Sequence, residues 1–131
     1  MTKNKMKPSQ YDILIVEDSK YIIELLFDII ISKGFSCKAA RNFPEVMAEL
    51  NKKKPPKLIF LDINLPDLNG YKFCKYLKSE EKYKDILVYY LTGNPQTEVA
   101  LKVLETRADG YITKPFDLSS FKDVFDYIKN S

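Results

Sequence analysis

The sequence has no histidine and no tryptophan, and only two of its 131 residues are cysteines. The absence of histidine excludes Ser/His and Cys/His catalytic triads, histidine-ligated zinc and a histidine general base. Cys37 and Cys74 are far apart in the chain and lie within apolar patterns. We therefore expect buried free thiols rather than a disulfide or a metal site.

Long apolar runs are also missing. The most apolar stretch, residues 21–31, is too short to span a bilayer and carries Glu24 and Asp28. The first ten residues contain lysines but no apolar segment after them, which supports neither a secretory signal nor a membrane anchor. We therefore expect a cytoplasmic protein without a membrane partner.

An excess of charge of one sign is absent as well, since 21 Lys and Arg residues face 18 Asp and Glu residues. A net charge of +3 is too small to indicate a nucleic-acid surface without a clustered basic stripe. A chain of 131 residues that is 45% hydrophobic has the size and composition of one domain. We predict a flexible basic tail over residues 1–10 and one compact domain over residues 11–131.

Short apolar runs alternate along the chain with longer segments of helical period, which is the pattern of βαβ units. The fold class predicted is therefore α/β, with a doubly wound, five-stranded parallel sheet and helices on both faces. Gly34 is expected to end the first helix, and Asp117 to cap the last one. The predicted strands are 12–16, 36–40, 57–61, 86–91 and 110–113, and the predicted helices are 22–33, 44–52, 71–79, 97–106 and 118–128.

Polar residues stand where the predicted strands end. Glu17 and Asp18 follow the first strand, Asp62 the third, Thr92 the fourth and Lys114 the fifth. Ligands of open α/β sheets bind outside the carboxyl ends of the strands. We therefore expect these five side chains to meet in one crevice.

The chemistry of this set favours phosphoryl transfer. Three carboxylates brought together repel one another unless a cation lies among them, and an all-oxygen donor set favours Mg²⁺. Lys114 and Thr92 supply an ammonium and a hydroxyl, which can bind the oxygens of a phosphoryl group that a carboxylate nucleophile has accepted. Positioning and charge neutralisation are most of what such a transfer needs.

Four stretches of the sequence resemble the signature segments of response-regulator receiver domains of two-component signalling. They read VEDSK, LDINLPDLNG, YYLTGN and DGYITKPF, and the resemblance extends from Tyr11 to Ile128. It implies a flavodoxin-like sheet with the strand order 2-1-3-4-5. It also implies that Asp62 is the phosphoacceptor and that Asp18, Asp62 and the backbone carbonyl of Asn64 hold Mg²⁺, or alternatively Mn²⁺, with Glu17 acting through water.

The resemblance assigns three further roles. Thr92 would be the switch hydroxyl, Tyr111 the switch aromatic, and Lys114 the phosphoryl-binding lysine, joined to Pro115 by a cis peptide bond. Arg107 departs from the family pattern, because a glycine is commoner at its position.

The partners implied are a histidine kinase or a histidine phosphotransfer protein, and a downstream target or a second copy that binds the surface of the fourth helix, fifth strand and fifth helix. That surface offers Lys102, Val103, Arg107, Tyr111 and Lys122 as a mixed apolar and basic patch. The chain ends at Ser131, so we expect a stand-alone regulator without an output domain, no nucleic-acid partner, and no catalysis beyond its own phosphorylation and dephosphorylation. The alternative is a receiver excised from a longer regulator or hybrid kinase.

Other functions remain open from the residues alone. Singly, Glu17 and Asp18 are explained as helix caps and Asp62 as a turn residue. A Mg²⁺-dependent aspartate phosphohydrolase of the haloacid dehalogenase type needs a second acid two residues after its nucleophile, where this chain has Asn64. A flavodoxin-like cofactor module needs a phosphate-binding loop after the first strand, where this chain has two acids. A receiver-like interaction scaffold is the remaining alternative.

Overall fold

The structure is a computed structural model that describes residues 11–52, 54–93, 96–116 and 118–130. The predicted tail over residues 1–10 lies outside the described residues, as does Asp117. The elements, in chain order, are β1 (Ile13–Val16), α1 (Lys20–Ser32), β2 (Cys37–Ala40), α2 (Phe43–Leu50), β3 (Leu58–Asp62), β4 (Asn64–Leu65), β5 (Leu68–Asn69), α3 (Gly70–Ser79), β6 (Leu87–Thr92), α4 (Gln96–Thr106), β7 (Gly110–Thr113), a 3₁₀ turn (Leu118–Phe121) and α5 (Lys122–Lys129).

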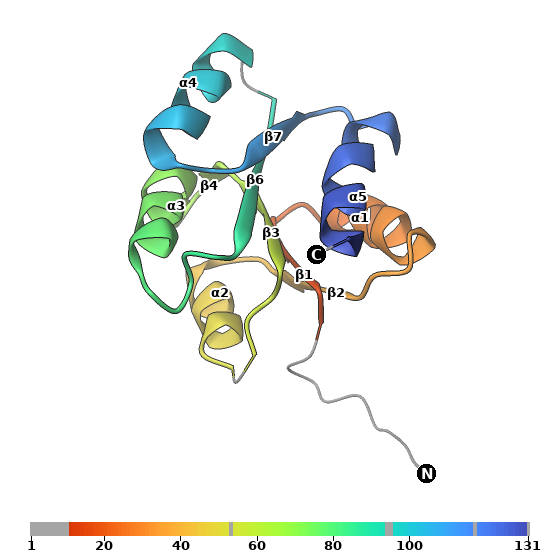
Figure 1. The fold of residues 1–131 in the computed structure, drawn as a ribbon, viewed down its shortest axis with the longest axis horizontal. Coiled ribbons are helices and arrows are strands. Elements are labelled where there is room, and N and C mark those ends of the chain that lie inside the picture. The colour runs from red at the N-terminus through yellow and green to blue at the C-terminus, as the bar shows by residue number, and fades with distance from the viewer. Residues whose placement is uncertain (1–10, 53, 94–95, 117, 131) are drawn as a thin grey trace.

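The main sheet has five parallel strands in the order β2-β1-β3-β6-β7. Numbering only the strands of this sheet turns that order into 2-1-3-4-5, so the predicted fold class and strand order are confirmed. Helices α1 and α5 cover one face of the sheet, and α2, α3 and α4 cover the other (Figure 1).

Residues of the central strands alternate between two hydrophobic cores. Leu14 of β1 and Ile59 of β3 belong to the core under α2, α3 and α4, whereas Ile13 and Phe60 belong to the core under α1 and α5. All four are fully buried. A parallel strand covered on both faces needs apolar side chains at consecutive positions, which explains the uninterrupted runs in the sequence.

Capping side chains fix where the helices begin. The hydroxyl of Ser19 accepts the Ile22 N–H at the start of α1, and Asn42 and Asn69 cap α2 and α3 in the same way. Gly34 has a φ of 89° just after α1, as predicted for a glycine that ends a helix. The predicted bounds of the helices differ from the observed ones by one or two residues at most ends, but a 3₁₀ turn replaces the first turn predicted for the last helix.

A small antiparallel hairpin, β4–β5, follows β3, where the sequence indicated only a turn. Leu65 and Leu68 pair across it and are both more than nine-tenths buried. The close packing of the segment requires Gly70, because a Cβ there would lie 2.9 Å from the Cα of Ile63. The hairpin therefore holds the chain after Asp62 in a defined conformation.

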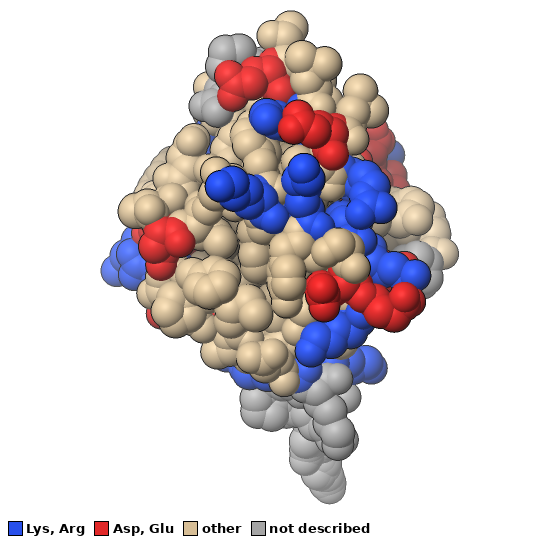
Figure 2. All heavy atoms as spheres, turned by 90° about the vertical axis from the view of Figure 1, so that its left-hand side faces the viewer, with Lys and Arg blue, Asp and Glu red and all other residues tan. Residues whose placement is uncertain are grey.

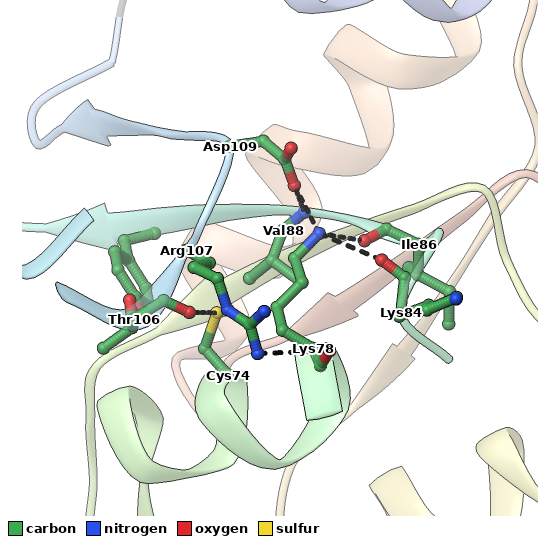
Figure 3. A network of polar contacts seen from close by, with 9 residues as sticks. Cys74, Lys78, Lys84, Ile86, Val88, Thr106, Arg107 and Asp109 are labelled. Atoms are coloured by element: carbon green, nitrogen blue, oxygen red, sulfur yellow. Dashed lines mark hydrogen bonds and ion pairs between the residues drawn. The ribbon is translucent and has the colours of Figure 1, made fainter. Parts of the chain in front are cut away.

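A lysine of α3 joins three segments at the amino-terminal edge of the sheet (Figure 3). The Lys78 ammonium donates to the Ile86 carbonyl at 2.8 Å and forms an ion pair with Asp109 at 2.8 Å. The same Asp109 oxygen accepts the N–H of Val88 at 2.8 Å. These contacts tie the end of α3 to the start of β6 and to the segment before β7.

Both cysteines are free, as expected, but only Cys74 is buried, and Cys37 is half-buried. The prediction that Cys37 is buried is therefore wrong in degree, because β2 is an edge strand whose side chains are covered incompletely. Within the described part of the chain, no helix has the length and apolar character needed to cross a membrane.

Candidate functional site

Three carboxylates meet at the carboxyl edge of the sheet, where β1 and β3 lie side by side. Glu17 and Asp18 follow β1 directly, and Asp62 is the last residue of β3. Each offers a carboxylate oxygen, and the three oxygens lie within 4.8 Å of one another. The structure thus brings together three of the residues proposed from the sequence.

Glu17 is 1% exposed and uses both of its carboxylate oxygens. One accepts the backbone N–H groups of Asp18 and Ser19, at 3.2 and 3.1 Å, and the other accepts the Lys114 ammonium at 3.1 Å. Burial raises the pKa of Glu17, the charge of Asp62 adds to this rise, and the hydrogen bonds from Ser19 and Lys114 oppose it. Glu17 therefore serves both as a cap of the loop before α1 and as the partner of Lys114.

Asp62 is also buried, with 4% of its surface exposed, although it is a carboxylate at the end of a strand. One of its oxygens accepts the backbone N–H of Asn64 at 3.0 Å and lies 3.8 Å from the Lys114 ammonium. The main chain of Asn64, predicted to contribute a metal ligand, is therefore adjacent to Asp62. Asp18, in contrast, is exposed to solvent.

Lys114 enters the site from the end of β7. Its peptide bond to Pro115 is cis, as the resemblance implied, and its N–H donates to the Thr92 carbonyl at 2.7 Å. The side chain is 26% exposed and is the one cation among the predicted site residues. Three carboxylates against one ammonium leave two negative charges uncompensated in this crevice, which suits a divalent cation.

Thr92 and Tyr111 lie on the same side of the sheet. Thr92 is the fully buried last residue of β6, and Tyr111 on β7 is half-buried. The register pairs Tyr90 with Tyr111 and Thr92 with Thr113, so Tyr111 lies one side-chain step from Thr92 on that face. Tyr111 packs against the core under α2, α3 and α4, and not in the carboxylate cluster.

Sequence reasoning missed Arg41. Its guanidinium donates to the Asp18 carbonyl at 2.8 Å, and its N–H donates to Glu45 at 2.7 Å. Arg41 follows the second strand, so its position at the carboxyl edge was available from the same argument that found Asp62. A lone arginine after a strand nevertheless carries no specific functional signal in the sequence.

The surface predicted to contact a target lies over α4, β7 and α5 and contains a groove. A groove of about 510 Å³ lies between α4, β7 and α5, and Val103 and Tyr111 line it. Lys102 and Lys122 instead form ion pairs with acidic residues of their own helices, and Arg107 donates to a carbonyl of α3. The mixed apolar and basic patch therefore stays a prediction as a binding surface, with local ion pairs and a contact with α3 now assigned to its basic side chains.

The strand order and the three carboxylates together define a flavodoxin-like α/β domain with an acidic cluster at the carboxyl edge of its sheet. The family model of the response regulator receiver domain matches residues 13–126. The chain belongs to this family, as the resemblance in the sequence indicated.

Relatives of known function and structure agree with this assignment. The phosphate regulon transcriptional regulatory protein PhoB of Escherichia coli is 40% identical over 104 residues, which cover 79% of this chain and 45% of PhoB. The polar-differentiation response regulator DivK of Brucella anthropi is 28% identical over 109 residues, covering 83% of this chain and 88% of DivK.

Among solved structures, the signal receiver domain of a signal transduction histidine kinase from Syntrophus aciditrophicus has a TM-score of 0.79 and 30% identity. The match covers 92% of this chain and 91% of that one. The chain spans about half the length of the PhoB proteins that it matches, so the output of those longer regulators is not carried over.

Proposed function

We propose that this receiver accepts a phosphoryl group on Asp62 and signals through protein contacts that depend on its phosphorylation. The observation that carries the proposal is the cluster of Glu17, Asp18 and Asp62 beside Lys114. The Lys114 ammonium lies 3.1 Å from Glu17 and 3.8 Å from Asp62. An acceptor carboxylate needs a cation and an ammonium beside it to approach a phosphate anion. The three carboxylates offer ligands for the cation, and Lys114 supplies the ammonium.

The donor set fits Mg²⁺, or alternatively Mn²⁺, because all of its ligands are oxygens. Asp18, Asp62 and the backbone carbonyl of Asn64 would hold the ion, and Glu17 would act through water. When bound, the ion neutralises charge between Asp62 and the incoming phosphoryl oxygens.

In the reaction, an Asp62 oxygen attacks the phosphorus of a phosphohistidine or a small acyl phosphate. A bond forms between that oxygen and phosphorus, and the bond from phosphorus to the donor breaks, leaving histidine or the acyl carboxylate. Lys114 exchanges its contact with Asp62 for a phosphoryl oxygen, since a charge-assisted hydrogen bond favours the more highly charged group. The only catalysis proposed is this self-phosphorylation and the later hydrolysis that removes the phosphoryl group from Asp62.

Thr92 is the proposed link between chemistry and output. Its hydroxyl would bind a phosphoryl oxygen, and the space that it leaves on its face of the sheet would be filled by Tyr111. This movement changes the groove between α4, β7 and α5, which Tyr111 lines. The switch is a population shift between two packings that a target or a second copy distinguishes.

The proposed donor is a histidine kinase or a histidine phosphotransfer protein, and no nucleic-acid partner is proposed. The chain acts either as a separate regulator or as the receiver part of a longer regulator or hybrid kinase. The cytoplasmic location expected from the sequence stays a prediction.

An aspartate phosphohydrolase is the less favoured function. It needs a proton donor two residues after Asp62, and the amide of Asn64 cannot supply a proton as a carboxylic acid does. Sustained turnover of a phosphate ester, measured as phosphate release far beyond one equivalent of protein, would favour that function over ours.

The proposed function is tested by treating the protein with acetyl phosphate and measuring its intact mass. We expect one added phosphoryl group in the presence of Mg²⁺, none in excess EDTA, and none in Asp62→Asn. Asp85→Asn is the matched control, because Asp85 is an exposed aspartate outside the crevice, and it should be labelled like the wild type. Equal labelling with EDTA, or of Asp62→Asn, would remove Asp62 from this role.

A further inference from the structure

A second concave surface lies between α2 and α3, away from the groove that Tyr111 lines. It encloses about 560 Å³ and is called here the α2–α3 groove. Its lining comes from α2, from the β4–β5 hairpin and from α3, and consists of Phe43, Met47, Asp67, Leu68, Asn69, Lys72, Phe73 and Tyr76.

Aromatic side chains form the walls of this groove. Phe43 and Tyr76 are 40% and 41% exposed. The Phe43 and Phe73 rings meet edge to face at 6.3 Å, and the Phe73 and Tyr76 rings stack at 6.1 Å. Phe73 is buried, so it supports the two exposed rings from below, and exposed aromatic side chains that line a groove are a common feature of interaction sites.

Lys72 lines the groove, and Lys75, three residues further along α3, is its neighbour on the helix surface. Lys72 and Lys75 are exposed on α3, and neither forms an ion pair with any residue that the structure describes. The one acidic residue of the lining, Asp67, accepts the N–H of Phe43 at 3.1 Å. Figure 2 shows basic side chains running across the side of the molecule that carries α3 and α4, next to uncharged surface.

The groove is connected to the site of the proposed phosphorylation through the hairpin. Asp67 and Asn69 line the groove, and Asn69 pairs with Asn64 across β4–β5. The N–H of Asn64 in turn donates to the Asp62 carboxylate at 3.0 Å. A molecule bound in the groove therefore contacts a hairpin whose other strand, β4, donates a hydrogen bond to Asp62.

We propose that the α2–α3 groove docks an acidic amphipathic helix of a partner protein. Apolar side chains of that helix would pack between Phe43 and Tyr76, and its Asp and Glu residues would pair with Lys72 and Lys75. A groove walled by two helices suits a helix, which presents apolar residues at i, i+3 or i+4, and i+7. Coupling of docking to the state of Asp62 rests on the proposed function, whereas docking itself does not.

The docking is tested by selecting peptides from a displayed library of random 16-residue sequences on the wild-type protein. Binders that also bind Lys72→Glu/Lys75→Glu are removed. We expect the remaining peptides to be rich in Asp and Glu, to carry apolar residues at helical spacing, and to shift the amide NMR signals of Phe43 and Phe73. Selected peptides without acidic excess, or shifts confined to α4, β7 and α5, would overturn the proposal.

Matched variants then separate the contribution of the lysine charges to peptide binding from that of the aromatic ring. Lys72→Glu/Lys75→Glu should weaken the selected peptide by at least about 10-fold, whereas Lys122→Glu/Lys129→Glu, the same charge change on α5, should leave it within about 2-fold. Tyr76→Ala should also weaken binding by about 10-fold or more, whereas Tyr21→Ala, which removes a tyrosine 72% exposed on α1, should not. Equal losses in test and control variants would overturn the proposal.

Two further measurements distinguish the remaining outcomes. Sedimentation velocity of the free protein tests whether a second copy occupies the groove. Self-association that is abolished by Lys72→Glu/Lys75→Glu would overturn the acidic-helix proposal. The rate of Asp62 labelling by acetyl phosphate is compared with and without the selected peptide, and we expect a change. An unchanged rate overturns the coupling alone, and a lack of any labelling contradicts the proposed function while the binding results still stand.

Discussion

The Lys114 ammonium lies 3.1 Å from a carboxylate oxygen of Glu17. It is also 3.8 Å from Asp62, so the crevice proposed for a divalent cation already contains a positive charge. Two cations in one crevice repel each other, and each lowers the affinity of the site for the other. The same lysine is proposed to bind the phosphoryl group after transfer.

Replacing Lys114 by Met should therefore strengthen Mg²⁺ binding but slow the phosphorylation of Asp62. We expect the dissociation constant for Mg²⁺ to fall by about 3-fold to 10-fold, because a like charge has been removed, and labelling of Asp62 by acetyl phosphate to slow by at least about 10-fold. Calorimetric titration measures the first and intact mass the second. Lys122→Met is the control for loss of an exposed lysine, and weaker Mg²⁺ binding by Lys114→Met would contradict the argument.

A second prediction separates phosphorylation from signalling. Thr92→Ala removes the hydroxyl proposed to bind a phosphoryl oxygen but leaves the three carboxylates and Lys114 in place. Asp62 should still be labelled. In the wild type we expect phosphorylation to change the affinity for a partner or a second copy by about 5-fold to 150-fold, and in Thr92→Ala this change should be lost. Thr92→Ser, which keeps the hydroxyl, is the matched control. If Thr92→Ala retains the full change in affinity, Thr92 is not the link to the output surface.

The positions of the site residues were predictable because one rule covered them all. Asp62 is the last residue of its strand, and Glu17 and Lys114 directly follow theirs. The carboxyl ends of parallel strands meet at one edge of the sheet. The β4–β5 hairpin was not predictable, since its two residue pairs, one of asparagines and one of buried leucines, look like a turn in the sequence. The contacts of the predicted surface lysines and of Arg107 were not predictable, because the sequence does not show where long side chains point, as the contact of Arg107 with α3 illustrates.

The third prediction concerns a buried carboxylate outside the site. Glu49 is 8% exposed and accepts the Tyr11 hydroxyl at 2.9 Å, and it forms ion pairs with Lys38 and Lys52 at 3.1 and 2.9 Å. Burial acts to raise the pKa of Glu49, but the hydrogen bonds from its three partners outweigh burial and lower the pKa below its ordinary value of 4.5. A carboxylate whose pKa is lowered by folding stabilises the folded state while it is ionised.

Glu49→Gln should therefore reduce the free energy of unfolding at pH 7 by about 1–3 kcal/mol. The contribution of Glu49 is complete above its unfolded pKa and is lost as the pH falls through the folded pKa, so the difference between wild type and variant should shrink below pH 4.5. Urea denaturation at a series of pH values measures this difference. A difference that stays constant across that range would mean that the charge of Glu49 does not stabilise the fold.

The last prediction concerns the residue that follows α4. Arg107 has a φ of 64°, in the left-handed region that favours glycine. Its guanidinium donates to the Lys78 carbonyl at 3.4 Å, a long contact that offsets little of the backbone cost (Figure 3). Arg107→Gly should therefore raise the free energy of unfolding by about 0.5–1 kcal/mol, seen as a higher urea midpoint with an unchanged slope. Ala100→Gly, at an exposed position inside the same helix, should instead lower it by about 1 kcal/mol. If both substitutions destabilise the protein equally, the backbone conformation of Arg107 is not a source of instability.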